Sequence, residues 1–160
     1  MVGDALRLAW LRLQARGRLR AGASVHVARG VRVRVAPGAR VELGPGASLG
    51  PDSRIEARAG LVRLGARARL GERAVIVAHA GVELGDGALL GEWAAVADTA
   101  PTAGDSETPL RRQPLAVAPV VVGAGARVGP HAALTPGARV AAGAEVAPYA
   151  VVAGERTSSP

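Results

Sequence analysis

Three histidines, His26, His79 and His131, are the side chains best suited to take a proton from a hydroxyl near neutral pH. His79 precedes Asp98 by nineteen residues, and a carboxylate can orient an imidazole that acts as a general base. His26 alternates with valines, which predicts an exposed position on a strand without a chemical role. His79 with Asp98 is therefore the candidate catalytic pair, and a corner histidine without a chemical role is the alternative.

Arginine supplies every basic side chain except histidine, because the sequence contains no lysine. A guanidinium group can bind a phosphate through two parallel hydrogen bonds. Arg111 with Arg112, and also Arg127 and Arg139, are therefore candidates for binding a phosphate-bearing ligand, although solvated arginines are the alternative. Trp93 either stacks on the ring of a bound ligand or packs beneath the polar segment that follows it.

Composition excludes several other chemistries. The absence of cysteine excludes disulfides and thiolate nucleophiles, and the absence of lysine excludes a P-loop lysine and a Schiff base. The three histidines are more than fifty residues apart, so no metal site is predicted. The net charge is +7, but no aromatic residues accompany the arginines in a nucleic-acid-binding pattern. We therefore expect a cytoplasmic protein without a signal peptide, a metal or a nucleic-acid partner.

A six-residue repeat must position these side chains. In the C-terminal part the repeat places aliphatic anchors at Val122, Val128, Leu134, Val140, Val146 and Val152. An alanine follows each of the first five anchors by four residues. The same pattern, with shifts of frame, gives earlier anchors at Leu43, Leu49, Ile55, Leu61, Leu64, Leu70, Ile76, Leu84, Leu90 and Val96. Glycine, proline, aspartate and serine stand between the anchors and predict corners.

A period of six fits a short strand with two inward side chains, followed by a corner. Three such sides form a coil of about eighteen residues, and parallel pairing stacks successive coils about 4.8 Å apart. A thin core of this kind explains why the chain contains no phenylalanine. The sequence therefore predicts an all-β solenoid, whereas an ordinary β-sandwich would have no reason to keep the period.

Two segments depart from the repeat. Residues 4–18 predict a helix with Asp4 as its N-cap and with Leu6, Ala9, Trp10 and Leu13 on one face. Such a helix either covers the first coil or rests on an anionic membrane surface. Residues 98–118 form a polar insertion between regular coils. We expect a helical cap over residues 1–20, a solenoid over 21–154 and a polar tail over 155–160.

The phased hexapeptides over about residues 25–154 resemble the hexapeptide-repeat acyltransferases, whose fold is a left-handed parallel β-helix. Asp98, the insertion with Pro109 and Gln113, and the sequence APVVVG at 118–123 are most similar to the maltose, galactoside and colanic-acid O-acetyltransferase group. The resemblance implies a homotrimer, with acetyl-CoA in a cleft between subunits and a histidine as general base for an acceptor hydroxyl. It places His131 close to the pantetheine of CoA and keeps Gly154 of the family's closing motif. Together with the phosphate candidates Arg127 and Arg139, these are the predicted donor contacts.

The chain departs from this group at several positions. The insertion contains no histidine, and Arg127 replaces the tryptophan of the family's WIG motif. Pro130 and Pro148 stand where family members offer backbone N–H groups to CoA, and the closing AGNPA motif is reduced to Gly154 within AGERTSSP. Two hypotheses follow: an acyl-CoA-dependent O-acetyltransferase acting on a saccharide or related metabolite, or a non-catalytic trimeric solenoid with an assembly or regulatory role.

Overall fold

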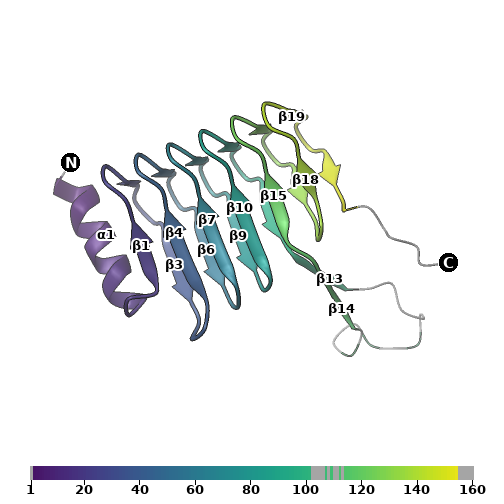
Figure 1. Ribbon diagram of the computed structural model, residues 1–160, viewed down its shortest axis with the longest axis horizontal. Helices are drawn as coiled ribbons and strands as arrows, with labels where there is room; N and C mark the ends of the chain where they lie inside the picture. Colours follow the sequence, from purple (N-terminus) through teal and green to yellow (C-terminus); the bar gives the residue numbers. More distant parts are fainter. Residues whose placement is uncertain (1, 102–106, 108, 110–111, 113, 155–160) are drawn as a thin grey trace.

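The computed structural model describes residues 2–101, 107, 109, 112 and 114–154. One helix and three six-stranded parallel sheets form a solenoid of about six turns, in which each coil contributes one strand to each sheet (Figure 1). The architecture confirms the predicted all-β parallel solenoid with a short N-terminal helix, and it agrees with the left-handed β-helix that the resemblance implies.

The described elements are helix α1 (Val2–Gln14), the three sheets and one hairpin. Sheet A contains β1 (Leu19–Ala21), β4 (Arg40–Leu43), β7 (Leu61–Leu64), β10 (Gly81–Leu84), β15 (Val120–Val122) and β18 (Arg139–Val140). Sheet B contains β2 (His26–Val27), β5 (Ser48–Leu49), β8 (Arg69–Leu70), β11 (Leu89–Leu90), β16 (Arg127–Val128) and β19 (Glu145–Val146). Sheet C contains β3 (Arg32–Val35), β6 (Arg54–Ala57), β9 (Val75–Ala78), β12 (Ala95–Ala97), β17 (Ala133–Leu134) and β20 (Val151–Val152). The hairpin consists of β13 (Thr99–Pro101) and β14 (Leu115–Val117).

The core is a column of small aliphatic side chains. Except for Leu61, the predicted anchors up to Val140 are buried. The last two anchors, Val146 and Val152, are partly buried. The anchor at Leu61 is wrong: Leu61 points outward on β7, and Val62 takes the inward position. The reason is that β6 and β7 each have four residues and a three-residue corner joins them, so the six-residue frame does not continue across that corner.

The three corners of the coil differ in regularity. Four residues connect sheet A to sheet B in every coil, and four residues connect sheet B to sheet C. We call these the A–B and B–C corners. The C–A corner, from sheet C to the next strand of sheet A, has four residues after β3, three after β6 and two after β9. After β12 it contains the hairpin, which projects from the solenoid (Figure 1). All variation in coil length therefore occurs at the C–A corner.

Helix α1 covers the first coil, but its bounds and orientation differ from the prediction. It begins at Val2, so Asp4 is not an N-cap; Asp4 lies in the first turn and accepts a bond from Arg7 Nη1 at 2.9 Å. It ends at Gln14, because Arg16 and Gly17 adopt positive φ angles of 49° and 81°. Leu8, Leu11 and Ala15 pack on the core, whereas the predicted apolar face is exposed. Within the described residues, no helix is both long enough and apolar enough to cross a membrane.

Candidate functional site

The C–A corner after β12 is where the repeat opens. Asp98 follows β12 directly, and its carbonyl accepts a bond from the Ala118 N–H at 3.0 Å, which closes the base of the hairpin. Strands β13 and β14 pair antiparallel from Thr99 with Val117 to Pro101 with Leu115. One coil earlier, His79 and Ala80 form the shortest C–A corner of the solenoid. The structure therefore places His79 directly beside the start of the insertion, as the nineteen-residue spacing predicts.

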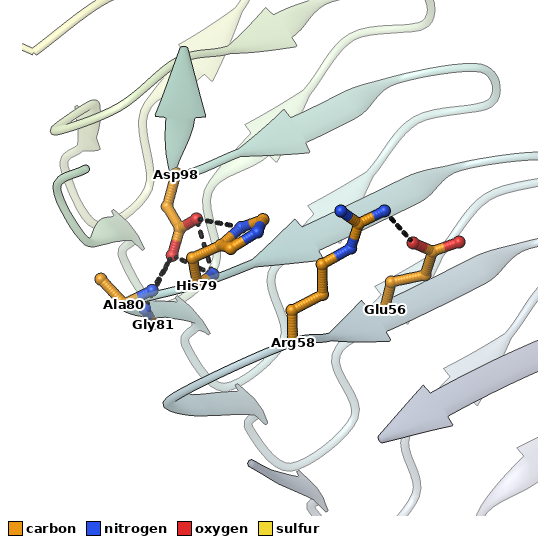
Figure 2. Close-up of polar contacts among 6 residues, drawn as sticks. All are labelled: Glu56, Arg58, His79, Ala80, Gly81 and Asp98. Carbon is orange, nitrogen blue, oxygen red and sulfur yellow. Dashed lines mark hydrogen bonds and ion pairs between the residues drawn. The ribbon is translucent and has the colours of Figure 1, made fainter. Parts of the chain in front are cut away.

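The carboxylate of Asp98 is held by backbone groups of this short corner. Oδ1 accepts the His79 N–H at 2.8 Å, and Oδ2 accepts the N–H groups of Ala80 at 2.6 Å and Gly81 at 2.8 Å (Figure 2). Asp98 is fully buried. A carboxylate that accepts three backbone N–H groups satisfies donors that a two-residue corner leaves without other partners. Asp98 thus joins the corner at His79 to the base of the hairpin.

The imidazole of His79 lies near this carboxylate without a hydrogen bond to it. Nδ1 is 3.8 Å from Asp98 Oδ1, which is too long for a hydrogen bond. Nδ1 is buried and has no hydrogen-bond partner in the described residues, although the side chain as a whole is 29% exposed. Asp98 therefore fixes the backbone that carries His79 instead of orienting the ring directly.

Three charged residues that the sequence analysis did not single out, Arg54, Glu56 and Arg58, lie one coil before His79. Glu56 is mostly buried and lies 3.3 Å from both Arg54 Nη1 and Arg58 Nη2. Figure 2 shows the Glu56 and Arg58 pair on the same face of the solenoid as His79. Because Ala57 pairs with Ala78, Arg58 is the residue that corresponds to His79 in the preceding coil. Subtracting one coil of 21 residues from position 79 would have identified Arg58 in the sequence.

A stack of side chains runs along the B–C corner. Its members occupy the third position of four successive turns: Arg73, Trp93, His131 and Tyr149. The Arg73 guanidinium lies 4.8 Å from the Trp93 ring centroid. The Trp93 and His131 centroids are 6.0 Å apart, and those of His131 and Tyr149 are 4.8 Å apart with nearly parallel planes. We call this row the corner stack.

The corner stack covers the faces of the rings that the sequence offered for ligand binding. Arg73 and His131 occupy the two faces of Trp93, and the Trp93 side chain does not pack beneath the hairpin in any described contact. His131 lies between Trp93 and Tyr149. A ligand at this corner therefore meets ring edges and the outer face of Tyr149. Pro130 and Pro148 precede the stacked residues, and a proline has no N–H to donate at this turn position. The Pro130 carbonyl accepts a bond from the Tyr149 N–H of the next coil at 3.0 Å.

The remaining candidate residues are distributed over the other sides. Arg127 is exposed on sheet B, directly after the A–B corner, and Arg139 is exposed on sheet A. Gly154 lies at the C–A corner of the last coil, where a Cβ would be 2.6 Å from Pro136 O. One chain therefore does not bring the four candidate donor contacts together. Arg112 is exposed, and Arg111 lies outside the described residues.

The histidines also occupy three separate sides. His26 is exposed on sheet B, as predicted, and its Nδ1 lies 3.4 Å from Asp4 Oδ2 of α1. His79 is at the C–A corner, and His131 is at the B–C corner. Although His79 and His131 each follow an anchor by three residues, their anchors belong to sheet C and sheet B respectively.

Known structures share this fold at low sequence identity. A point mutant of AntD, an N-acyltransferase from Bacillus cereus in complex with dTDP-4-amino-4,6-dideoxyglucose and coenzyme A, matches with a TM-score of 0.72 and 12% identity. The match covers 93% of this chain and 76% of that chain. AntD in complex with dTDP and 3-hydroxybutyryl-CoA matches with a TM-score of 0.63 and 12% identity, over 93% and 79% of the two chains. No family model matches the sequence, and no curated protein matches it significantly.

Proposed function

We propose that the protein is an acyl-CoA-dependent acyltransferase that transfers an acetyl group to a hydroxyl of a saccharide or related metabolite. The observation that carries the proposal is His79, held beside the buried Asp98 where the insertion leaves the solenoid. The fold likeness to AntD, which was crystallised with acyl-CoA, CoA and a nucleotide sugar, supports the same class of reaction. AntD is an N-acyltransferase, whereas the proposed acceptor here is a hydroxyl. The acceptor group, hydroxyl or amine, therefore distinguishes O-acetylation from N-acylation.

The reaction needs one base and accurate positioning. His79 accepts the proton of the acceptor hydroxyl while the hydroxyl oxygen attacks the thioester carbonyl of acetyl-CoA. The new ester bond forms, the carbon–sulfur bond breaks, and the CoA thiolate receives the proton from His79. Asp98 acts as a positioning residue, because its bonds to the backbone of His79, Ala80 and Gly81 fix the place from which the imidazole projects.

The proposed donor and acceptor contacts are those that the sequence indicates. Arg127, His131, Arg139 and Gly154 are the proposed contacts for acetyl-CoA, and the phosphates of CoA suit the guanidinium groups. Trp93, Arg111 and Arg112 are the proposed contacts for the acceptor. The donor contacts lie near two different corners of one chain, so a cleft between copies is required to bring them to one ligand.

Sheet C offers a surface for such a homotrimer. Its outward positions change character along the stack, from Arg32, Arg34, Arg54 and Glu56 in the first two coils to Val75, Val77, Ala95, Ala97, Ala133 and Val151 in the later coils. An uncharged surface of small side chains can pack against a second copy without burying unpaired charge. We infer that the later coils of sheet C form the contact between subunits.

The first experiment is a calorimetric titration with acetyl-CoA, because it needs no knowledge of the acceptor. Saturable binding supports the donor site, and it justifies a screen of sugars, nucleotide sugars and amino sugars for release of the CoA thiol. Since the chain contains no cysteine, a thiol-detecting reagent reports that release without a background from the protein. Hydroxyl acceptors that react support O-acetylation, whereas a reaction confined to amino sugars supports N-acylation.

His79→Ala should reduce turnover by at least about a hundredfold, with acetyl-CoA affinity retained. His26→Ala is the matched control, because His26 is exposed at the far end of the solenoid and contacts only Asp4 among the described side chains. Unchanged turnover in the His79 variant would refute its role as the base. Absence of acetyl-CoA binding together with a stable oligomer would favour the non-catalytic solenoid, which the missing loop histidine and the two prolines support.

A further inference from the structure

The net positive charge of the protein resides in the first 40 residues. They contain nine arginines and one acidic residue, Asp4, whereas the other 120 residues contain eleven arginines and twelve acidic residues. In the structure Asp4 is already paired with Arg7, at 2.9 Å. The charge asymmetry therefore belongs to one end of the solenoid, formed by α1 and the first coil (Figure 1).

Helix α1 presents an unpartnered apolar stripe at this same end. Val2, Leu6, Trp10 and Leu13 are 77%, 66%, 59% and 70% exposed, whereas Leu11 of the same helix is buried. The opposite face of the helix is attached to the first coil through Leu8, Leu11 and the bond from Arg7 Nη1 to Val27 O at 3.0 Å. The stripe is therefore the outer surface of a helix whose orientation is already fixed.

Arginines surround this stripe. Trp10 lines a surface hollow with Arg32 and Arg34, and Leu13 lines another with Arg16 and Arg34. Exposed arginines of the same end are Arg12, Arg16, Arg20, Arg29, Arg32 and Arg34. An acidic side chain lies within ion-pair distance of none of these six among the described residues. The end of the molecule thus combines an apolar centre with unneutralised guanidinium groups around it.

We propose that this end, α1 with the arginines of the first coil, docks on an anionic lipid surface. Val2, Leu6, Trp10 and Leu13 enter the boundary between headgroups and acyl chains, and the arginines contact anionic headgroups. A tryptophan is suited to that boundary, because its ring is apolar and its N–H is polar. In Figure 1, α1 forms one end of the described solenoid and presents this face outward, and the hairpin β13–β14 lies toward the opposite end.

Charge and shape favour a lipid surface over other occupants. Two copies that met through this end would bring two strongly basic surfaces together, which is repulsive. A nucleic acid would neutralise the arginines but would offer its phosphate backbone, and no apolar layer, to Leu6 and Trp10. An anionic bilayer supplies both kinds of contact in one plane. The proposal is independent of the acyltransferase function, because none of these residues belongs to the candidate site.

The test is co-sedimentation of the full chain with vesicles of phosphatidylcholine containing about 30% phosphatidylglycerol, compared with pure phosphatidylcholine vesicles. We expect binding to the anionic vesicles that salt weakens, and little binding to the neutral ones. In a Trp93→Phe background, Trp10 is the sole tryptophan, and its fluorescence should shift to the blue when anionic vesicles are added.

Two pairs of variants separate the apolar and charged contributions. Leu6→Glu with Trp10→Glu, and separately Arg16→Glu with Arg34→Glu, should each weaken the partition coefficient by at least about tenfold. These side chains are exposed, so a thermal melt should show retained folding. Leu115→Glu, an exposed leucine of the hairpin, and Arg63→Glu with Arg69→Glu, exposed on the middle coils, are the matched controls and should bind as the parent does.

Four results would overturn the proposal. The first is equal binding to neutral and anionic vesicles, and the second is vesicle binding that survives both pairs of substitutions at the α1 end. The third is an unshifted Trp10 spectrum in the presence of bound vesicles. The fourth is self-association through the α1 end that anionic vesicles do not reduce. Binding to duplex DNA that resists Leu6→Glu with Trp10→Glu, without vesicle binding, would identify a polyanion site instead. None of these outcomes changes the result of the acetyl-CoA titration, so the two proposals fail separately.

Discussion

The A–B and C–A corners of the solenoid contrast in one respect: the first has the same length in every coil, and the second varies from two residues to the insertion that contains the hairpin. Each A–B corner has four residues, and from the second coil onward its fourth residue donates a backbone bond to the carbonyl of its first, as in Ala47 N to Gly44 O at 3.1 Å. The C–A corner shrinks from four residues to two and then accepts the hairpin. The regular corners therefore keep the coils in register, which leaves the third corner free to carry a site.

The two corners also use carboxylates differently. At an A–B corner, the exposed Asp86 accepts one bond from the Ala66 N–H of the preceding coil at 2.8 Å. At the C–A corner, the buried Asp98 accepts the N–H groups of three consecutive residues of the preceding coil. A regular corner is held mainly by backbone bonds within it and to neighbouring coils, such as Arg67 N to Pro45 O at 2.9 Å, whereas the shortened corner depends on a buried side chain from the next coil.

The largest effect should come from removing Asp98. Asp98→Ala leaves three backbone N–H groups without their acceptor in a buried place, and we expect it to lower the free energy of unfolding by about 3 kcal/mol or more. Urea denaturation followed by circular dichroism measures this loss. Asp86→Ala is the matched control and should have a much smaller effect, because water can replace its single exposed bond. Equal losses in the two variants would remove the distinction between the corners.

A smaller effect should come from crowding a regular corner. A Cβ at Gly44 would lie 2.5 Å from the carbonyl carbon of Gly65 in the next coil, so Gly44→Ala should cost about 2 kcal/mol of unfolding free energy. Gly87 has space around it but a φ of +68°, so Gly87→Ala should cost only about 1 kcal/mol through backbone strain. Thermal or chemical denaturation of both variants tests the order, and a more damaging Gly87 variant would contradict it.

The smallest effect should come from the corner stack. There, larger residues occupy the turn position with positive φ that glycine fills at most A–B corners. Tyr149→Gly removes a ring contact worth about 0.5–1.5 kcal/mol but relieves the backbone strain of a non-glycine residue at a φ of 62°. The net change in unfolding free energy should therefore stay within about 1 kcal/mol. Tyr149→Ala loses the same contact and keeps the strained φ angle. It should therefore be the less stable of the two in denaturation, and the reverse order would show that φ strain is unimportant here.

Much of the fold could be predicted from the repeat. Inward anchors such as Val122, Val128 and Leu134 are buried in successive sheets as the period of six requires. The spacing between His79 and Asp98 correctly placed them in neighbouring coils, because 21 and 20 residues per coil lie close to nineteen. Leu61 was misplaced because the corner before β7 has three residues, and a fixed six-residue period does not predict a change of corner length.

The helix shows a different limit of sequence reasoning. The pattern of Leu6, Trp10 and Leu13 correctly groups these side chains on one face, but it does not say which face meets the coil. Two apolar faces exist, and Leu8, Leu11 and Ala15 form the one that packs. Contacts outside the helix, such as Arg7 Nη1 to Val27 O, fix that choice, and no periodicity within the helix records them.

The sequence by itself determined the inward and outward positions of the coils, because a short strand alternates its side chains whatever surrounds it. It also determined the thin aliphatic core and the place of the insertion. The tertiary structure alone decided on which of the three corners each residue lies, since that depends on the summed lengths of all preceding corners. For this reason His79 and His131, which have the same phase in the sequence, lie on different edges of the solenoid: one beside Asp98 and the hairpin, the other within a stack of rings.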